Sequence, residues 1–248
     1  MERKKHLLTM IVLLLLFSIQ AVSSNKKSIY QAFVYSRMEE WKQIIDAMET
    51  NKQKTDEFLH ELVNFQYGYI GYCLGENDKS GARKYLELAE KNLETLEKTG
   101  FNPAIIHAYH SAFWGFKISM SPWKAPVYGR RSINHVNQAI EIDKNMAFVH
   151  VQYGLAYFYM PAIFGGSKKV AVEHFLVAQN LMETTPDEIK YDWNYLNLLT
   201  LIGQSYEEIK EYEKAKTYYL KTLAIEPEFQ WVKDELYPNL MNKMNNEK

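Results

Sequence analysis

The stretch LTLIGQSYEEIKEYEKAKTYYLKTLAIEP at residues 199–227 decides the fold. Small residues recur in it at Gly203 and Ala215, and a tyrosine follows each of them, at Tyr206 and Tyr219. Apolar residues three and four positions apart form one face of an α-helix. The spacing therefore predicts two helices that cross closely at the small residues, with the two tyrosines filling the space between this hairpin and its neighbours.

This spacing, with Leu199 and Ile202 before the glycine and Pro227 after the second helix, resembles the tetratricopeptide repeat (TPR). That repeat is a helical hairpin of about 34 residues, and its copies stack into a curved solenoid. The resemblance implies an all-α fold, an α-α superhelix of about four to five helical hairpins. It also implies a protein that binds or scaffolds others.

Looser copies of the pattern lie upstream, so we expect a single repeat domain over residues 28–246. When Gly115 is laid on Gly154, three further anchor positions coincide, namely Pro122 with Pro161, His135 with His174 and Ala139 with Ala178. The spacing is longer than the consensus in both hairpins. We therefore predict insertions near residues 121–131 and 161–167, at equivalent hairpin turns.

Residues 161–175, PAIFGGSKKVAVEHF, carry a more particular resemblance. They look like a hairpin of exported bacterial TPR proteins, among them the T-component associated with TRAP transporters. That family implies a periplasmic, often oligomeric accessory protein with a passage for a solute. It supplies the alternative function for this chain, an accessory protein that handles a small solute.

The N-terminus has the order of a secretory signal peptide. Basic residues at positions 3–5 precede an apolar run over residues 7–17, and small residues follow at positions 21–23. We expect residues 1–23 to be cleaved and the mature protein to be periplasmic. An uncleaved membrane anchor is the alternative, although the run is shorter than the roughly 20 residues that a span needs.

Composition excludes several function classes. The 47% of apolar residues and 24% of charged residues are typical of a folded globular chain. The 29 basic and 30 acidic residues give a net charge of -1, which argues against general nucleic-acid binding. Cys73 is the single cysteine, so neither an internal disulfide nor a cysteine-based zinc site can form. An exported chain without disulfides fits a bacterial envelope.

No recognised catalytic motif is present, so we expect no enzyme activity, no cofactor and no metal. His107 and His110 are one helical turn apart and could ligate a metal if His135, His150 or His174 supplied a third nitrogen. Because His135 and His174 occupy equivalent repeat positions, a role in packing or hydrogen bonding is the favoured interpretation.

The concave face of the superhelix is the first candidate site. Positions that face the groove in TPR proteins are here Tyr109, Ala112, Phe116, Phe148, Val151, Leu155, Phe158, Tyr159, Asn197, Thr200, Gln204, Glu207 and Glu208. An apolar wall with a polar end suits a peptide, a helix or an apolar small ligand. The alternative is that several of these side chains pack against neighbouring hairpins in a tightly curled superhelix.

The edge that carries the two insertions is the second candidate site, with Trp123, Arg130 and Arg131 as binding residues. Tryptophan and arginine dominate binding hot spots, and insertions at equivalent turns fall on one edge of a solenoid. We expect an exported non-enzymatic scaffold that binds a protein, peptide or apolar ligand on its concave face or insertion edge. The expectation includes no stable membrane span after cleavage and leaves a homo-oligomer open.

Overall fold

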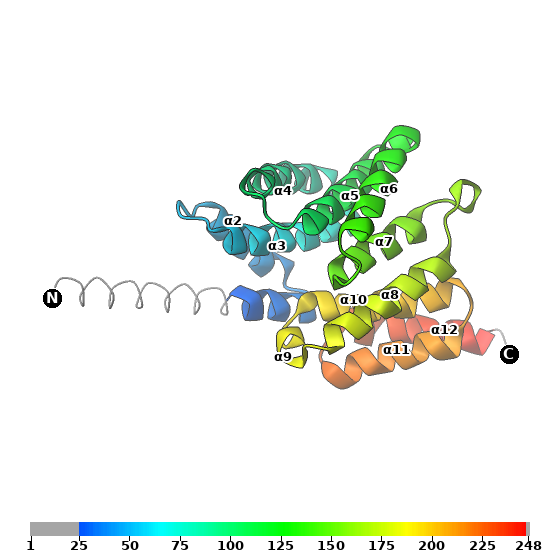
Figure 1. Cartoon of the computed structure of the whole chain (residues 1–248). Helices are drawn as coiled ribbons and strands as arrows, with labels where there is room; N and C mark the ends of the chain where they lie inside the picture. Colours follow the sequence, from blue (N-terminus) through cyan, green and yellow to red (C-terminus); the bar gives the residue numbers. More distant parts are fainter. Residues whose placement is uncertain (1–24, 247–248) are drawn as a thin grey trace.

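The computed structural model describes residues 25–246, which contain helices and turns and no strand, so the predicted all-α class is confirmed (Figure 1). The predicted signal peptide lies outside these residues. The elements are a helix over residues 25–34, α2 (Met38–Glu49), α3 (Asp56–Gly75), α4 (Lys79–Thr99), α5 (Pro103–Met120), η1 (Pro122–Lys124), α6 (Ala125–Ile142), α7 (Ala147–Tyr159), η2 (Ala162–Phe164), α8 (Lys168–Glu183), α9 (Pro186–Ile189), α10 (Trp193–Glu208), α11 (Tyr212–Ile225), η3 (Trp231–Leu236) and α12 (Tyr237–Asn246).

Four helical hairpins, α3/α4, α5/α6, α7/α8 and α10/α11, stack in the order of the chain. Helix α5 lies against α4, α7 lies against α5 and α6, and α10 lies against α8, while α12 covers α11. Each helix in such a stack buries its apolar stripe against the helices on both sides. The result is the curved all-helical superhelix that the repeats predicted.

Local sequence signals set the hairpin boundaries. The Thr55 hydroxyl accepts from the Phe58 N–H at 3.3 Å, and the Asp78 carboxylate accepts from the Gly81 N–H at 2.9 Å. These caps satisfy backbone donors that the first turn of a helix leaves unpaired. At the other end of α4, Gly100 takes a φ of 79°, a left-handed conformation that glycine adopts without strain.

Glycine permits close crossings within two of the hairpins. A Cβ atom on Gly203 would lie 2.4 Å from a ring carbon of Tyr219, and one on Gly154 would lie 2.4 Å from a ring carbon of Phe175. Any larger side chain would therefore push the paired helices apart. The predicted small positions are where the helices of α10/α11 and α7/α8 meet.

The role predicted for Tyr219 is wrong in one respect. Its ring is fully buried on Gly203 within its own hairpin, rather than between hairpins. The contact with the preceding hairpin is made instead by Tyr218, whose hydroxyl donates to Gln179 Oε1 of α8 at 3.0 Å. Adjacent residues of a helix project about 100° apart, so one faces the partner helix and the next faces the neighbouring hairpin.

The two predicted insertions differ in structure. Residues 160–167 form an open turn that contains η2. Most of residues 121–131 are helical, because α6 begins at Ala125 directly after the short η1. Pro126 does not prevent this, since a proline in the first turn of a helix removes an N–H that would lack a partner there. The first insertion therefore lengthens the hairpin α5/α6.

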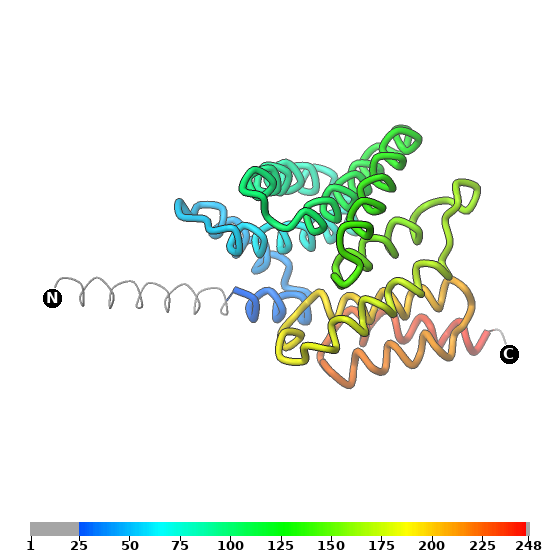
Figure 2. Tube along the Cα trace, in the orientation of Figure 1, coloured from blue at the N-terminus to red at the C-terminus, as the bar shows by residue number. Residues whose placement is uncertain are grey.

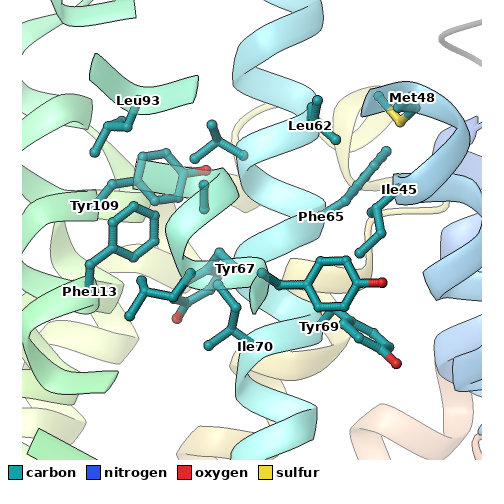
Figure 3. Packing of buried hydrophobic residues seen from close by; sticks show 14 of the residues in the cluster. Ile45, Met48, Leu62, Phe65, Tyr67, Tyr69, Ile70, Leu93, Tyr109 and Phe113 are labelled. Atoms are coloured by element: carbon teal, nitrogen blue, oxygen red, sulfur yellow. The ribbon is translucent and has the colours of Figure 1, made fainter. Parts of the chain in front are cut away.

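Three clusters of buried side chains form the core, two large ones and a small one of Ala104, Ala108, Ala139 and Val149 between α5, α6 and α7. The first joins α2, α3, α4 and α5, and Figure 3 shows part of it, with Tyr67, Tyr109 and Phe113 among its aromatic members. The second joins residues 25–34 with α8, α10, α11 and the C-terminal helix. Figure 2 shows that the N-terminal helix lies beside the C-terminal hairpin although the two are far apart in sequence. The superhelix thus closes on itself.

The closure is made by aromatic rings. The Trp193 ring centroid lies 5.1 Å from that of Trp41 and 5.8 Å from that of Phe33. The Trp193 indole N–H donates to Asn64 Oδ1 of α3 at 3.0 Å, so the last hairpin is tied to the first. The ring also passes directly over Gly68, where an added Cβ would lie 2.8 Å from it. Of the two arrangements considered for the predicted groove, the structure adopts the tightly curled superhelix.

This closure predicts opposite effects for two glycines of α3. Gly68→Ala should lower the free energy of unfolding by about 1–3 kcal/mol, because the methyl group would collide with the Trp41 and Trp193 rings. Gly71→Ala, which meets no atom within 4 Å, should raise it by up to about 1 kcal/mol through helix propensity. Urea unfolding followed by circular dichroism measures both. Equal stability of the two variants would contradict the closure.

Candidate functional site

The first half of the predicted groove is core. Tyr109, expected on the concave wall, is fully buried, and Asn64 Nδ2 of α3 lies 3.3 Å from its hydroxyl. Burial raises the pKa of Tyr109 well above its usual value. The expectation for this residue is wrong because the curled superhelix brings α3 over the inner face of α5. Thr200 of α10 is likewise fully buried and donates to the Leu196 carbonyl at 2.9 Å.

Other predicted wall residues are partly covered. Phe116 and Phe148 lie with their ring centroids 5.5 and 5.8 Å from that of Tyr67, which packs against the first core. Val151 and Leu155 pack against the second core in the same way. Their remaining exposure is too small for them to form an open binding wall by themselves.

A cleft of about 290 Å³ lies where α7 ends, between α10 and the C-terminal helix. Eight residues line it, namely Phe158 and Tyr159 of α7, Gln204, Glu207 and Glu208 of α10, and Leu236, Asn239 and Lys243 of the C-terminal helix. The structure thus brings together the C-terminal part of the predicted groove. Asn197, also predicted, is half-buried two turns away on α10 and does not line the cleft.

Tyr159 shows the character of this cleft. Its side chain is 73% exposed, yet burial still raises the pKa of its hydroxyl. It is also one of the eight residues that line the cleft. Tyr159, at the end of α7, therefore presents an exposed aromatic ring at the cleft.

Charges border the aromatic wall. Lys168 Nζ lies 3.4 Å from the centre of the Phe158 ring and donates to the Phe158 carbonyl at 2.6 Å. Desolvation lowers the pKa of Lys168, and the charge of Glu208 opposes this shift. Across the cleft, Lys243 donates to Glu207 Oε1 at 2.7 Å, and the other oxygen of that carboxylate accepts from Tyr219. The cleft therefore has an apolar wall and a rim of both signs.

Sequence reasoning missed the contribution of the C-terminal helix. The spacing of the TPR motif gives groove positions only for the repeats and none for the helix that follows them. Leu236 of η3 and Lys243 of α12 reach the cleft because η3 and α12 fold back along α11. The apolar spacing of Val232, Leu236 and Leu240 was the available signal that one face of this segment is buried.

The insertion edge has a different surface. Trp123 is 79% exposed, and Arg130 and Arg131 are exposed on the first turns of α6. The Arg131 guanidinium lies 4.6 Å from the centre of the Trp114 ring. None of these three predicted residues lines the cleft.

The histidines form two matched pairs. His107 Nδ1 lies 2.9 Å from His135 Nδ1 across α5/α6, and His150 Nδ1 lies 3.0 Å from His174 Nδ1 across α7/α8. A hydrogen bond between two imidazoles requires that one nitrogen be unprotonated. Burial lowers the pKa of both His135 and His174 to about 4. His135 and His174, which the sequence placed at equivalent positions, thus make the same contact, a hydrogen bond to a histidine of the preceding helix.

Neither histidine pair forms part of a metal site among the described residues. Within residues 25–246, no three His, Cys, Asp or Glu side chains come together in a geometry that could hold a metal ion. Cys73 is buried, and burial raises the pKa of its thiol to about 11, which leaves it a poor nucleophile.

Two carboxyl groups have unusual surroundings outside the cleft. Burial raises the pKa of Glu61 to about 7, and one of its oxygens has no hydrogen-bond partner among the described residues. Burial also raises the pKa of Asp192, which accepts from the Asn194 N–H at 2.9 Å. The charge of Lys26 acts on both carboxyls in the opposite direction.

Comparison with known proteins gives a structural likeness. No family model matches the chain, and no curated protein matches it. Among solved structures, the HusA haemophore from Porphyromonas gingivalis is similar, with a TM-score of 0.61 and 17% sequence identity over 75% of this chain and 93% of that one. At this identity the likeness shows the all-helical fold. No helix among the described residues is long and apolar enough to cross a bilayer.

The histidine pairs predict a loss of stability in mild acid. Because the folded state keeps His135 and His174 neutral while the unfolded chain binds protons below about pH 6.5, the free energy of unfolding should fall between about pH 6.5 and 4. Below about pH 4 the two states bind the same protons and this decline should end. The double variant His135→Asn/His174→Asn should decline less steeply between pH 7 and 5 in chemical denaturation. Parallel curves for the two proteins would refute the assignment.

Proposed function

We propose that this protein is an exported, non-enzymatic binding protein of the TPR type whose ligand or partner enters the cleft of α7, α10 and α12. The main support for this proposal is the exposure of Tyr159, an aromatic residue that lines the cleft and remains 73% exposed. Folding buries most large aromatic side chains, and an exposed one in a concave site is typical of a binding surface.

The lining suggests the chemistry of the ligand. The Phe158 and Tyr159 rings favour an apolar or flat aromatic body, while Gln204 and the Lys243–Glu207 pair offer polar contacts at the rim. The volume lies near the lower end of the range for ligand pockets, about 300–1,000 Å³. The cleft therefore suits the apolar part of a larger ligand, or one or two anchor side chains of a peptide.

Haem is the first ligand to test, because a structurally similar protein is described as a haemophore. Haem combines a flat apolar ring with anionic groups, which matches an aromatic wall beside Lys168 and Lys243. The hydrogen bonds of Glu207 favour a binding role over catalysis. A carboxylate that accepts from both Lys243 and Tyr219 is poorly placed to act as a general acid or base.

Haem titration, followed by absorbance and by quenching of tryptophan fluorescence, tests the proposal. Tyr159→Ser should weaken binding about tenfold, equal to about 1.4 kcal/mol of lost contact. The matched control is Leu220→Ser on α11, which is 43% exposed and lies outside the cleft. If haem does not bind, the same pair of variants is compared against an immobilised peptide library. Equal binding by both variants would exclude the cleft.

The T-component alternative makes a separate prediction. It requires a defined oligomer that encloses a passage. Light scattering of the folded protein measures this directly, and a monomer at all accessible concentrations would rule it out while leaving the cleft proposal intact.

A further inference from the structure

Four large apolar side chains at the turns of two adjacent hairpins are largely exposed to solvent. The exposed fractions are 79% for Trp123, 56% for Val127, 86% for Ile163 and 70% for Phe164. The turns that carry them project at the same end of the molecule, at the upper right of Figure 1, because α7 packs against both α5 and α6. Together these four residues are called the turn edge. Such a grouping marks an interaction surface.

Four cations near the turn edge lack ion-pair partners among the described residues. Lys124, Arg130, Arg131 and Lys169 lie on or beside it, and none of them forms an ion pair within the part of the chain that the structure describes. The sequence contains no Asp or Glu between Glu97 and Glu141, and none between Asp143 and Glu173. In a chain whose overall charge is -1, this is a marked local excess of positive charge.

The cations are held beside aromatic rings. Lys124 Nζ lies 5.0 Å from the centre of the Trp123 ring and 5.4 Å from that of Tyr128. The Arg131 guanidinium lies 4.6 Å from the Trp114 ring. Tryptophan and tyrosine with lysine and arginine beside them are the residues that favour the head-group level of a bilayer, where rings enter the interface and cations meet anionic lipids.

We propose that the turn edge docks the protein peripherally on an anionic membrane surface. Trp123, Ile163 and Phe164 enter the interface, and Arg130, Arg131 and Lys169 contact lipid phosphates. A membrane is favoured over a folded partner because the apolar side chains protrude from two separate turns. Protruding side chains suit a soft surface that yields to them, whereas a protein partner would have to present two matching pockets. The proposal does not depend on the ligand of the cleft.

Vesicle flotation tests the docking. Residues 25–248, which include the whole described fold, are used so that the apolar run at residues 7–17 does not contribute. The probe is phosphatidylcholine vesicles with about 30% phosphatidylglycerol, compared with phosphatidylcholine alone. Binding should be about tenfold stronger with the anionic lipid and should be lost at about 0.5 M salt.

Two variants separate the apolar and ionic contributions. Trp123→Ser/Ile163→Ser/Phe164→Ser should abolish flotation, and Arg130→Gln/Arg131→Gln/Lys169→Gln should reduce binding to the level seen with neutral vesicles. Circular dichroism should show both variants folded, since the changed side chains are exposed. The matched control Val177→Ser/Leu220→Ser/Lys91→Gln removes exposed residues from α4, α8 and α11, and it should bind like the parent chain.

Three outcomes would overturn the proposal. The parent chain fails to prefer anionic vesicles at low salt, or the control loses as much binding as the edge variants. The third is a dimer of the parent chain in light scattering that the serine variant dissolves while vesicles bind neither protein. That result would assign the turn edge to self-association.

Discussion

The packing of Trp193 against the first hairpin is the contact on which the shape of this protein depends. The indole lies on Trp41 and over Gly68, and its N–H is held by Asn64. A ring contact of this kind and a buried hydrogen bond each contribute about 0.5–1.5 kcal/mol. Their importance exceeds that energy, because they join the two larger cores, which the N-terminal helix also links through Ile29 in one and Tyr30 in the other.

Closure determines where binding can occur. An open superhelix would expose the inner faces of its middle hairpins, but here α3 covers α5 and converts Tyr109 from a wall residue into core. A concave surface is present at the C-terminal end, where α12 folds back along α11 and the cleft opens beside Tyr159. The outer ends of α5/α6 and α7/α8 are unaffected by closure, and they keep Trp123 and Phe164 in water.

The sequence predicted where the two helices of a hairpin cross. Gly203 and Gly154 were identified by spacing, and each indeed meets an aromatic ring of the partner helix. The equivalence of His135 and His174 likewise anticipated a shared role, which is a hydrogen bond to a second histidine. The place of Lys243 could not be predicted, because no repeat rule states how a terminal helix returns to the stack.

The sequence by itself determined the helices, their caps, the hairpins and the basic, apolar character of the turn edge, since these follow from residues a few positions apart. The tertiary structure alone decided which aromatic side chains are core and which line a cleft. The reason is that Asn64 and Trp193 are 129 residues apart, and their meeting depends on the small rotations between hairpins summed along the stack. Periodicity reports which face of a helix is apolar, and only the summed curvature decides what covers that face.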